Sequence, residues 1–120
     1  MATRPDLNGL RLRHPVSGYI YLVEGGVLHW IPDMATYTNL FKDITAHRDE
    51  VNLDRIDKGE DFSPGAILGR DETTGNIYLI SNNKKRFIVD MDVYRKYGFG
   101  NYTNMAPVAL NAIPDGDPIR

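Results

Sequence analysis

The chain has 120 residues, close to the commonest size of a single domain. Apolar residues make up 42% and charged residues 25%, which is typical of a folded globular protein and not of a disordered one. The net charge of −2 predicts no general attraction to nucleic acid or to an anionic membrane. The absence of cysteine excludes disulfides, thiolate-bound zinc and a thiol nucleophile.

The first half of the chain predicts a short strand, a β-hairpin and a short helix. The expected strands are Leu10–Arg13, Tyr19–Glu24 and Val27–Ile31. Gly25-Gly26 tolerates the positive φ that a two-residue type I′ turn needs at both central positions. Asp33 stands where it can cap the helix, and Val51–Ile56 is expected to be extended.

The second half predicts the same succession of elements. The expected strands are Ala66–Gly69, Asn76–Ser81 and Lys84–Val89. The turn is Asn82-Asn83, Asp90 is the expected helix cap, and Gly98 is the expected stop. A further extended segment is expected at Val108–Ile113. We expect the first three or four residues and the tail after Asp115 to be loose.

Gly18–Phe41 aligns with Gly75–Gly98 without a gap, 57 residues later. The identical pairs are Gly18/Gly75, Ile20/Ile77, Tyr21/Tyr78, Leu22/Leu79, Ile31/Ile88, Asp33/Asp90, Met34/Met91 and Tyr37/Tyr94. A register kept over this length predicts an internal duplication, with repeats at about residues 6–60 and 61–117. Two units are too few for a solenoid. We therefore expect a single α+β domain over residues 1–120, in which two pseudo-symmetric β-hairpin plus short helix units share one core.

The expected hairpin register gives each hairpin an aliphatic face and an aromatic face. The aliphatic face of the first hairpin carries Ile20, Leu22 and Ile31, and we assign it to the helix-packed core. The aromatic face pairs Tyr21 with Trp30 across the strands. That face has two interpretations: it packs inside the protein, which we favour, or it is an open platform for a sugar or peptide.

The candidate binding residues are therefore the two aromatic pairs and the basic tip of the second hairpin. They are Tyr21, Trp30, Tyr78, Phe87, Lys84, Lys85 and Arg86.

We expect no catalytic residues, no metal site and no cofactor. The three histidines share no metal-binding spacing, and His29, which has arginine as its counterpart, is interpreted as a partly exposed strand residue. Asp33 and Asp90 are explained by capping, so they are not assigned as a catalytic pair. No serine lies in a nucleophile-elbow sequence and no glycine run fits a phosphate loop.

The N-terminal sequence has no apolar run typical of a signal peptide, so we expect a cytoplasmic protein. Export by a route that reads no cleavable signal is the alternative. No stretch approaches the 18 or so consecutive apolar residues of a membrane span.

The two copies, YLVEGGVLHWIPDMATYTNLF and YLISNNKKRFIVDMDVYRKYGF, resemble a bacterial repeat of the approximate form YLIENGKKRHIPSPETFxxLGF. NAIPDGDPI near the C-terminus resembles the "aIPxGxPI" words that often close that repeat. The resemblance covers nearly the whole chain. It implies a bacterial binding or scaffold module, because such hairpin–helix repeats often accompany larger surface or secreted proteins and have no catalytic residues known to us.

The sequence thus favours a non-enzymatic binding or structural interaction module, whose partner is another protein or a second copy in an oligomer. The alternative is a carbohydrate-binding, lectin-like protein that uses the aromatic hairpin face. An enzyme of unrecognised type comes third. We do not expect nucleic acid or a membrane as partner.

Overall fold

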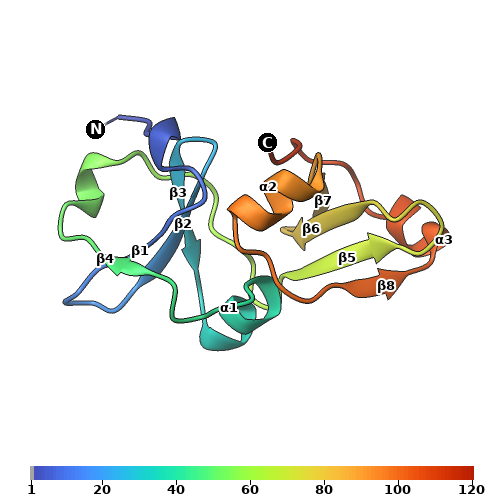
Figure 1. The fold of residues 1–120 in the computed structure, drawn as a ribbon, viewed down its shortest axis with the longest axis horizontal. Helices are drawn as coiled ribbons and strands as arrows, with labels where there is room; N and C mark the ends of the chain where they lie inside the picture. The colour runs from blue at the N-terminus through green and yellow to red at the C-terminus, as the bar shows by residue number, and fades with distance from the viewer. Residues whose placement is uncertain (1) are drawn as a thin grey trace.

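The computed structural model describes residues 2–120 and contains two four-stranded sheets, one from each half of the chain (Figure 1). The first half comprises η1 (Pro5–Leu7), β1 (Arg11–Arg13), β2 (Ile20–Glu24), β3 (Val27–Ile31), α1 (Met34–Leu40), β4 (Arg48–Asp49) and η2 (Leu53–Arg55). The second half comprises β5 (Ile67–Asp71), β6 (Ile77–Ser81), β7 (Lys84–Phe87), α2 (Met91–Lys96), β8 (Thr103–Met105) and α3 (Pro107–Asn111).

The two sheets have the same topology. Their strand orders are β3-β2-β1-β4 and β7-β6-β5-β8. In each sheet the hairpin is antiparallel, the first strand pairs antiparallel with it, and the last strand runs parallel to the first. The predicted α+β class, with two similar hairpin–helix units, is confirmed.

The hairpin registers are confirmed, with Tyr21 opposite Trp30 and Tyr78 opposite Phe87. The turn residues have positive φ in both copies, including 55° at Asn82 and 60° at Asn83. The turn sequence therefore differs between the units while the type I′ conformation is kept.

Both predicted helix caps are present. The Thr36 N–H donates to Asp33 Oδ1 over 2.7 Å, and the Val93 N–H donates to Asp90 Oδ1 over 2.8 Å. These bonds satisfy N–H groups that the first turn of a helix leaves without partners. Gly98, at φ 68°, follows α2 as expected.

The outer edge of each hairpin is covered by a segment that returns from later in the chain. The Leu28 N–H donates to Asp57 O. The Lys85 N–H donates to Pro114 O, and both members of this second bond lie 57 residues after their counterparts in the first. The second segment continues to Ile119, which is 0% exposed. The prediction of a loose tail is therefore wrong, because this tail completes the second sheet and fills the core.

Three further expectations from the sequence are wrong. Residues 2–4 are tied down, since the Ala2 N–H donates to Arg55 O over 3.1 Å and the Arg4 N–H donates to Gly26 O over 2.7 Å, whereas Met1 lies outside the described residues. Val51–Ile56 contains the 3-10 turn η2, and Val108–Ile113 overlaps the helix α3; neither is extended. Short local patterns of apolar residues fit an extended strand and a helical turn equally well, and the sequence alone did not separate them.

The two units share one core, as predicted. One continuous cluster contains Leu22, Ile31 and Tyr37 from the first unit and Leu79 and Ile88 from the second. The aliphatic hairpin faces thus point toward each other. The segments that follow α1 and α2 are joined by backbone hydrogen bonds. The Lys42 N–H donates to Gly98 O and the Gly100 N–H donates to Leu40 O, which adds a backbone link between the units.

The aromatic face of the first hairpin belongs to a second, smaller cluster. Tyr21 and Leu28 pack there with Leu53 and Ile56 of the η2 region, and Trp30 packs against them while staying partly exposed. Packing inside the unit, and not across the two units, therefore covers most of this face. None of the helices within residues 2–120 is long and apolar enough to cross a membrane.

Candidate binding sites

A cleft of about 780 Å³ lies where the two units meet. Its walls come from the turn and strands of the first hairpin, from β7, and from the two edge-covering segments near residues 59–60 and 115–120. Both units contribute, so this cleft exists only because the two units pack against each other.

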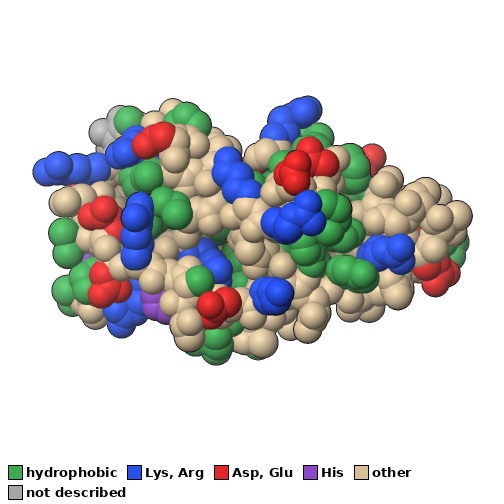
Figure 2. Space-filling view, viewed as in Figure 1, with side chains coloured by type: hydrophobic (Ala, Val, Ile, Leu, Met, Phe, Trp, Pro, Cys, Tyr) green, Lys and Arg blue, Asp and Glu red, His purple; other side chains and the backbone are tan. Residues whose placement is uncertain are grey.

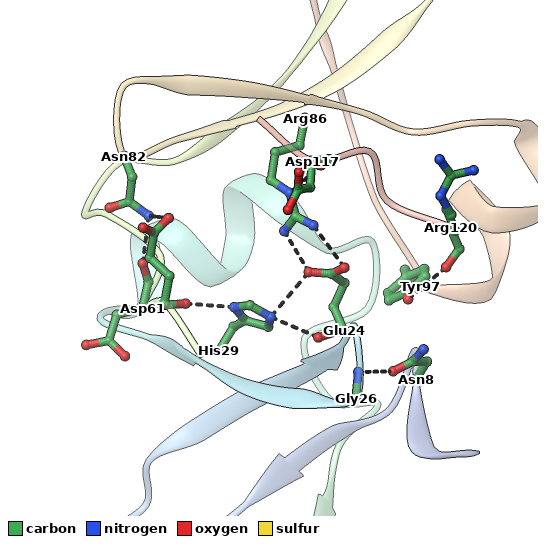
Figure 3. A network of polar contacts seen from close by, with 11 residues as sticks. Asn8, Glu24, Gly26, His29, Asp61, Asn82, Arg86, Tyr97, Asp117 and Arg120 are labelled. Carbon is green, nitrogen blue, oxygen red and sulfur yellow. Dashed lines mark hydrogen bonds and ion pairs between the residues drawn. The ribbon is translucent and has the colours of Figure 1, made fainter. Parts of the chain in front are cut away.

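An ion pair between two lining residues of the cleft joins the units (Figure 3). Glu24 ends β2, and Arg86 lies on β7 of the other unit. Arg86 Nη1 donates to Glu24 Oε1 over 2.6 Å, and Nη2 donates to Oε2 over 2.9 Å, so the contact is bidentate. The side chain of Glu24 is 8% exposed and that of Arg86 is 21% exposed. We call this pair the clasp, because it joins the two hairpins directly.

His29 on β3 belongs to the same hairpin as Glu24 and contacts it directly. Its Nδ1 lies 2.7 Å from Glu60 O, and its Nε2 lies 2.9 Å from Glu24 O and 3.2 Å from Glu24 Oε1. All of these partners are acceptors, so both ring nitrogens must donate, as only the protonated ring can. The interpretation of His29 as a partly exposed residue is wrong, since it is 7% exposed.

The clasp holds these groups in their charged forms. Burial alone would raise the pKa of Glu24, but the hydrogen bonds from His29 and Arg86, and their charges, outweigh it and hold this pKa at about 2. Burial opposes the charging of His29, yet the Glu24 carboxylate and the Glu60 carbonyl raise the pKa of the imidazole above its usual value. The neighbouring Tyr97 stays uncharged instead, because burial, with the nearby charge of Glu24, raises its pKa to about 12.

The rim of the cleft is polar and carries both signs of charge. Lys84 and Arg120 are exposed basic residues there, and Glu60 and Asp117 are exposed acidic ones. The same mixture holds more widely: on the face shown in Figure 2, basic and acidic side chains lie interspersed over both units. The cleft therefore presents no one-sign field to attract a polyanion or a polycation.

Each unit also has a small pocket between its hairpin and the start of its helix. The volumes are about 160 Å³ in the first unit and 140 Å³ in the second. The two sets of lining residues correspond position by position: Gly18/Gly75, Tyr19/Asn76, Ile20/Ile77, Trp30/Phe87, Ile31/Ile88, Pro32/Val89, Asp33/Asp90, Met34/Met91 and Tyr37/Tyr94. The two similar units thus share a hollow as well as a fold.

The structure separates the candidate binding residues that the sequence singled out. Tyr21 is buried, whereas Trp30, Tyr78 and Phe87 are half-buried. The ring of Tyr78 lies 5.7 Å from that of Phe87, centroid to centroid, as the predicted cross-strand pair requires.

The three basic residues of the second hairpin have three different situations. Lys84 is exposed on the rim of the cleft, and Arg86 forms the clasp. Lys85 is buried: its Nζ donates to Ile113 O over 2.6 Å and lies 2.9 Å from Asp115 Oδ1, so it fastens the tail to β7.

Sequence reasoning missed Glu24, Tyr19 and the role of His29. One signal was present, because Glu24 is an acidic residue in a strand whose other side chains are apolar or aromatic. A charge in such a place needs a partner. Nothing in the sequence showed that the partner lies 62 residues away.

No family model matches the chain. No curated protein sequence matches it, and no solved structure does either.

Proposed function

We propose that this protein is a non-enzymatic binding module and that the cleft between its two units receives a segment of a partner protein. The observation that carries this proposal is the cleft of about 780 Å³ built by both units around the clasp. Ligand sites in proteins are commonly concave, few in number and located where two structural units meet.

The chemistry of the clasp and of His29 supports binding and not catalysis. Both nitrogens of His29 are engaged by acceptors, so neither can take a proton from a substrate in this arrangement. Glu24 is held ionised by two cations, which makes it a poor base. The clasp instead supplies a fixed geometry, and preorganised sites spend less free energy on ordering when they bind.

The rim supports a protein partner. A surface with basic Lys84 and Arg120 beside acidic Glu60 and Asp117 complements a partner that also carries both charges. The resemblance to bacterial repeats that accompany larger proteins points to the same class. The bacterial origin that this resemblance implies, and the duplication that the alignment of the two halves predicts, belong to the proposal.

A peptide array tests this function. Labelled protein is applied to an array of short peptides that vary in charge pattern, and the hits are repeated with the double variant Lys84→Glu/Asp117→Lys. We expect the hits to weaken at least tenfold, because two exposed charge contacts at the rim become repulsive. The matched control, Arg48→Glu/Asp54→Lys, changes two exposed residues that do not line the cleft and should keep the hits.

Equal binding by the wild type and the rim variant would overturn the proposal. Self-association, the second kind of protein partner, is read from the same samples by sedimentation. If the protein forms a dimer and both double variants still form it, the surface that binds the second copy lies outside the cleft.

The carbohydrate-binding alternative rests on one observation in the first unit. Trp30 is partly exposed, and its ring lies 5.4 Å from that of Tyr19, which is 52% exposed. Exposed aromatic rings can stack on a sugar. Hits on a glycan array that Tyr19→Ala removes, and that the rim variant keeps, would favour this function over the first.

A further inference from the structure

The pocket of the first unit combines aromatic walls with an acidic rim. Tyr19 and Trp30 form one corner, with their rings tilted by 49°, and Tyr37 lines the pocket from α1. Tyr37 is 1% exposed, so its ring is fixed by the core beneath it. The flexible, exposed side chain of Met34 completes the mouth.

Asp33 supplies the charge. It is exposed, and its Oδ1 accepts from the Thr36 N–H, which orients the carboxylate beside the pocket. The same hydrogen bond lowers the pKa of Asp33 from its usual value, so the carboxylate is ionised at neutral pH. No lysine or arginine lines the pocket. Two arginines lie near it. Arg11, buried behind the pocket, donates to the Tyr37 hydroxyl over 3.1 Å and lies over that ring. Arg13, beside Gly18, is paired with Asp49.

We propose that the pocket formed by Tyr19, Trp30 and Asp33 binds a small quaternary ammonium group, such as the head of choline or of a trimethylated lysine. The faces of aromatic rings carry negative potential and attract a cation, and such rings around an alkylated ammonium are a recurrent arrangement. The negative charge of the Asp33 carboxylate attracts the cation as well. This site is distinct from the cleft, and the proposal does not depend on what the cleft binds.

The lining favours a quaternary ammonium over the other small ligands considered. An anion would meet Asp33 and the ring faces, which both repel it. A primary ammonium has three N–H donors to satisfy, whereas Asp33 is the one charged acceptor among the lining side chains. A trimethylammonium head has no N–H donors, and its methyl groups fit the apolar part of a hollow of about 160 Å³.

The second pocket serves as an internal control. Asp90, Met91 and Tyr94 repeat the first pocket, but Asn76 replaces Tyr19 and Phe87 replaces Trp30. The corner of two rings is therefore lost and the stronger cation–π partner, tryptophan, is absent. We expect this second pocket to bind the same ligands more weakly.

Trp30 is the only tryptophan, so its fluorescence reports on the first pocket directly. The protein is titrated with choline chloride at constant ionic strength, and separately with 3,3-dimethylbutan-1-ol, a neutral isostere of choline. We expect a saturable change with choline and a several-fold weaker one with the alcohol. The titration is then repeated with a peptide that contains trimethyllysine. Tighter binding of the peptide than of choline would indicate that the natural ligand is a modified protein, and tighter binding of choline would indicate a small molecule.

Two variants test the roles of the charge and the ring. Asp33→Asn keeps an efficient helix cap but removes the charge, and should weaken choline about fivefold while leaving the alcohol unchanged. Asp90→Asn is its matched control and should leave the Trp30 titration unchanged. Tyr19→Ala should weaken choline roughly three- to tenfold, whereas Tyr102→Ala, which removes an exposed ring outside the pocket, should not.

The proposal fails if choline and the neutral alcohol saturate alike, or if neither changes the emission. It also fails if Asp33→Asn and Asp90→Asn have equal effects on the choline titration. A circular dichroism spectrum of each variant confirms that it is folded before it is titrated.

Discussion

Replacing Arg86 by methionine tests the clasp most severely. The substitution keeps most of the apolar stem of the side chain but leaves the Glu24 carboxylate, 8% exposed, with His29 as its remaining cationic partner. Breaking a buried ion pair costs about 3–5 kcal/mol, because an uncompensated buried charge remains. Arg86 is 21% exposed, so water can partly replace it, and we expect a loss of about 2–4 kcal/mol in the free energy of unfolding.

Urea denaturation near pH 6, followed by Trp30 fluorescence and circular dichroism, measures this loss. The matched control is Arg95→Met, which removes an exposed i,i+3 pair with Asp92 and should cost less than about 1 kcal/mol. The double variant Glu24→Gln/Arg86→Met should recover part of the stability, because it removes the buried charge together with its partner. If Arg86→Met costs no more than Arg95→Met, the clasp does not hold the units together.

Three further predictions concern the helix caps, the C-terminal tail and the pH dependence of the clasp. Asp33→Ala and Asp90→Ala should each cost about 0.5–2 kcal/mol of stability, measured by urea denaturation, because each removes a helix cap, while Asn at either position should be nearly neutral. Ile119→Ala should cost about 2–5 kcal/mol by the same assay, since the residue is fully buried in the shared core; a loss below 1 kcal/mol would mean that the tail is not part of that core. The pKa of His29 is raised, so its contribution to stability is complete below about pH 6.5 and is lost as the pH rises through the raised pKa. The pKa of Glu24 is lowered to about 2, so its contribution is complete above about pH 4.5 and is lost as the pH falls toward 2. The urea midpoint should therefore peak between these limits, and a His29→Gln variant whose alkaline decline matches that of the wild type would contradict the assignment.

Features set by neighbouring residues could be predicted from the sequence. The hairpin register follows from the two residues of each turn, which tolerate positive φ. The helix caps follow because Asp33 and Asp90 lie one position before an apolar helical pattern. The aliphatic hairpin faces were predicted as core because Ile20, Leu22 and Ile31 recur unchanged in the second copy. Each of these inferences depends on contacts within a few residues or on the comparison of the two copies.

Features set by distant residues could not be predicted. The tail around Ile119 gains its order from β7, and Glu24 gains its partner from the other unit. The arginine that stands in place of His29 in the second unit, Arg86, argues against a ligand position there, and by itself it predicts only a partly exposed strand residue. In the folded protein the two residues meet at the same carboxylate, so the change from one copy to the other creates an asymmetric contact between the units.

Chemical-shift mapping with the best peptide from the array tests the central claim most directly. The peptide is added to ¹⁵N-labelled protein, and the amide shifts are followed to saturation. Binding in the cleft predicts the largest changes at Gly25, Lys84, Gly116 and Asp117, which come from both units and line one hollow. Changes confined to one unit, or centred on β4 and β8 at the opposite sheet edges, would contradict it.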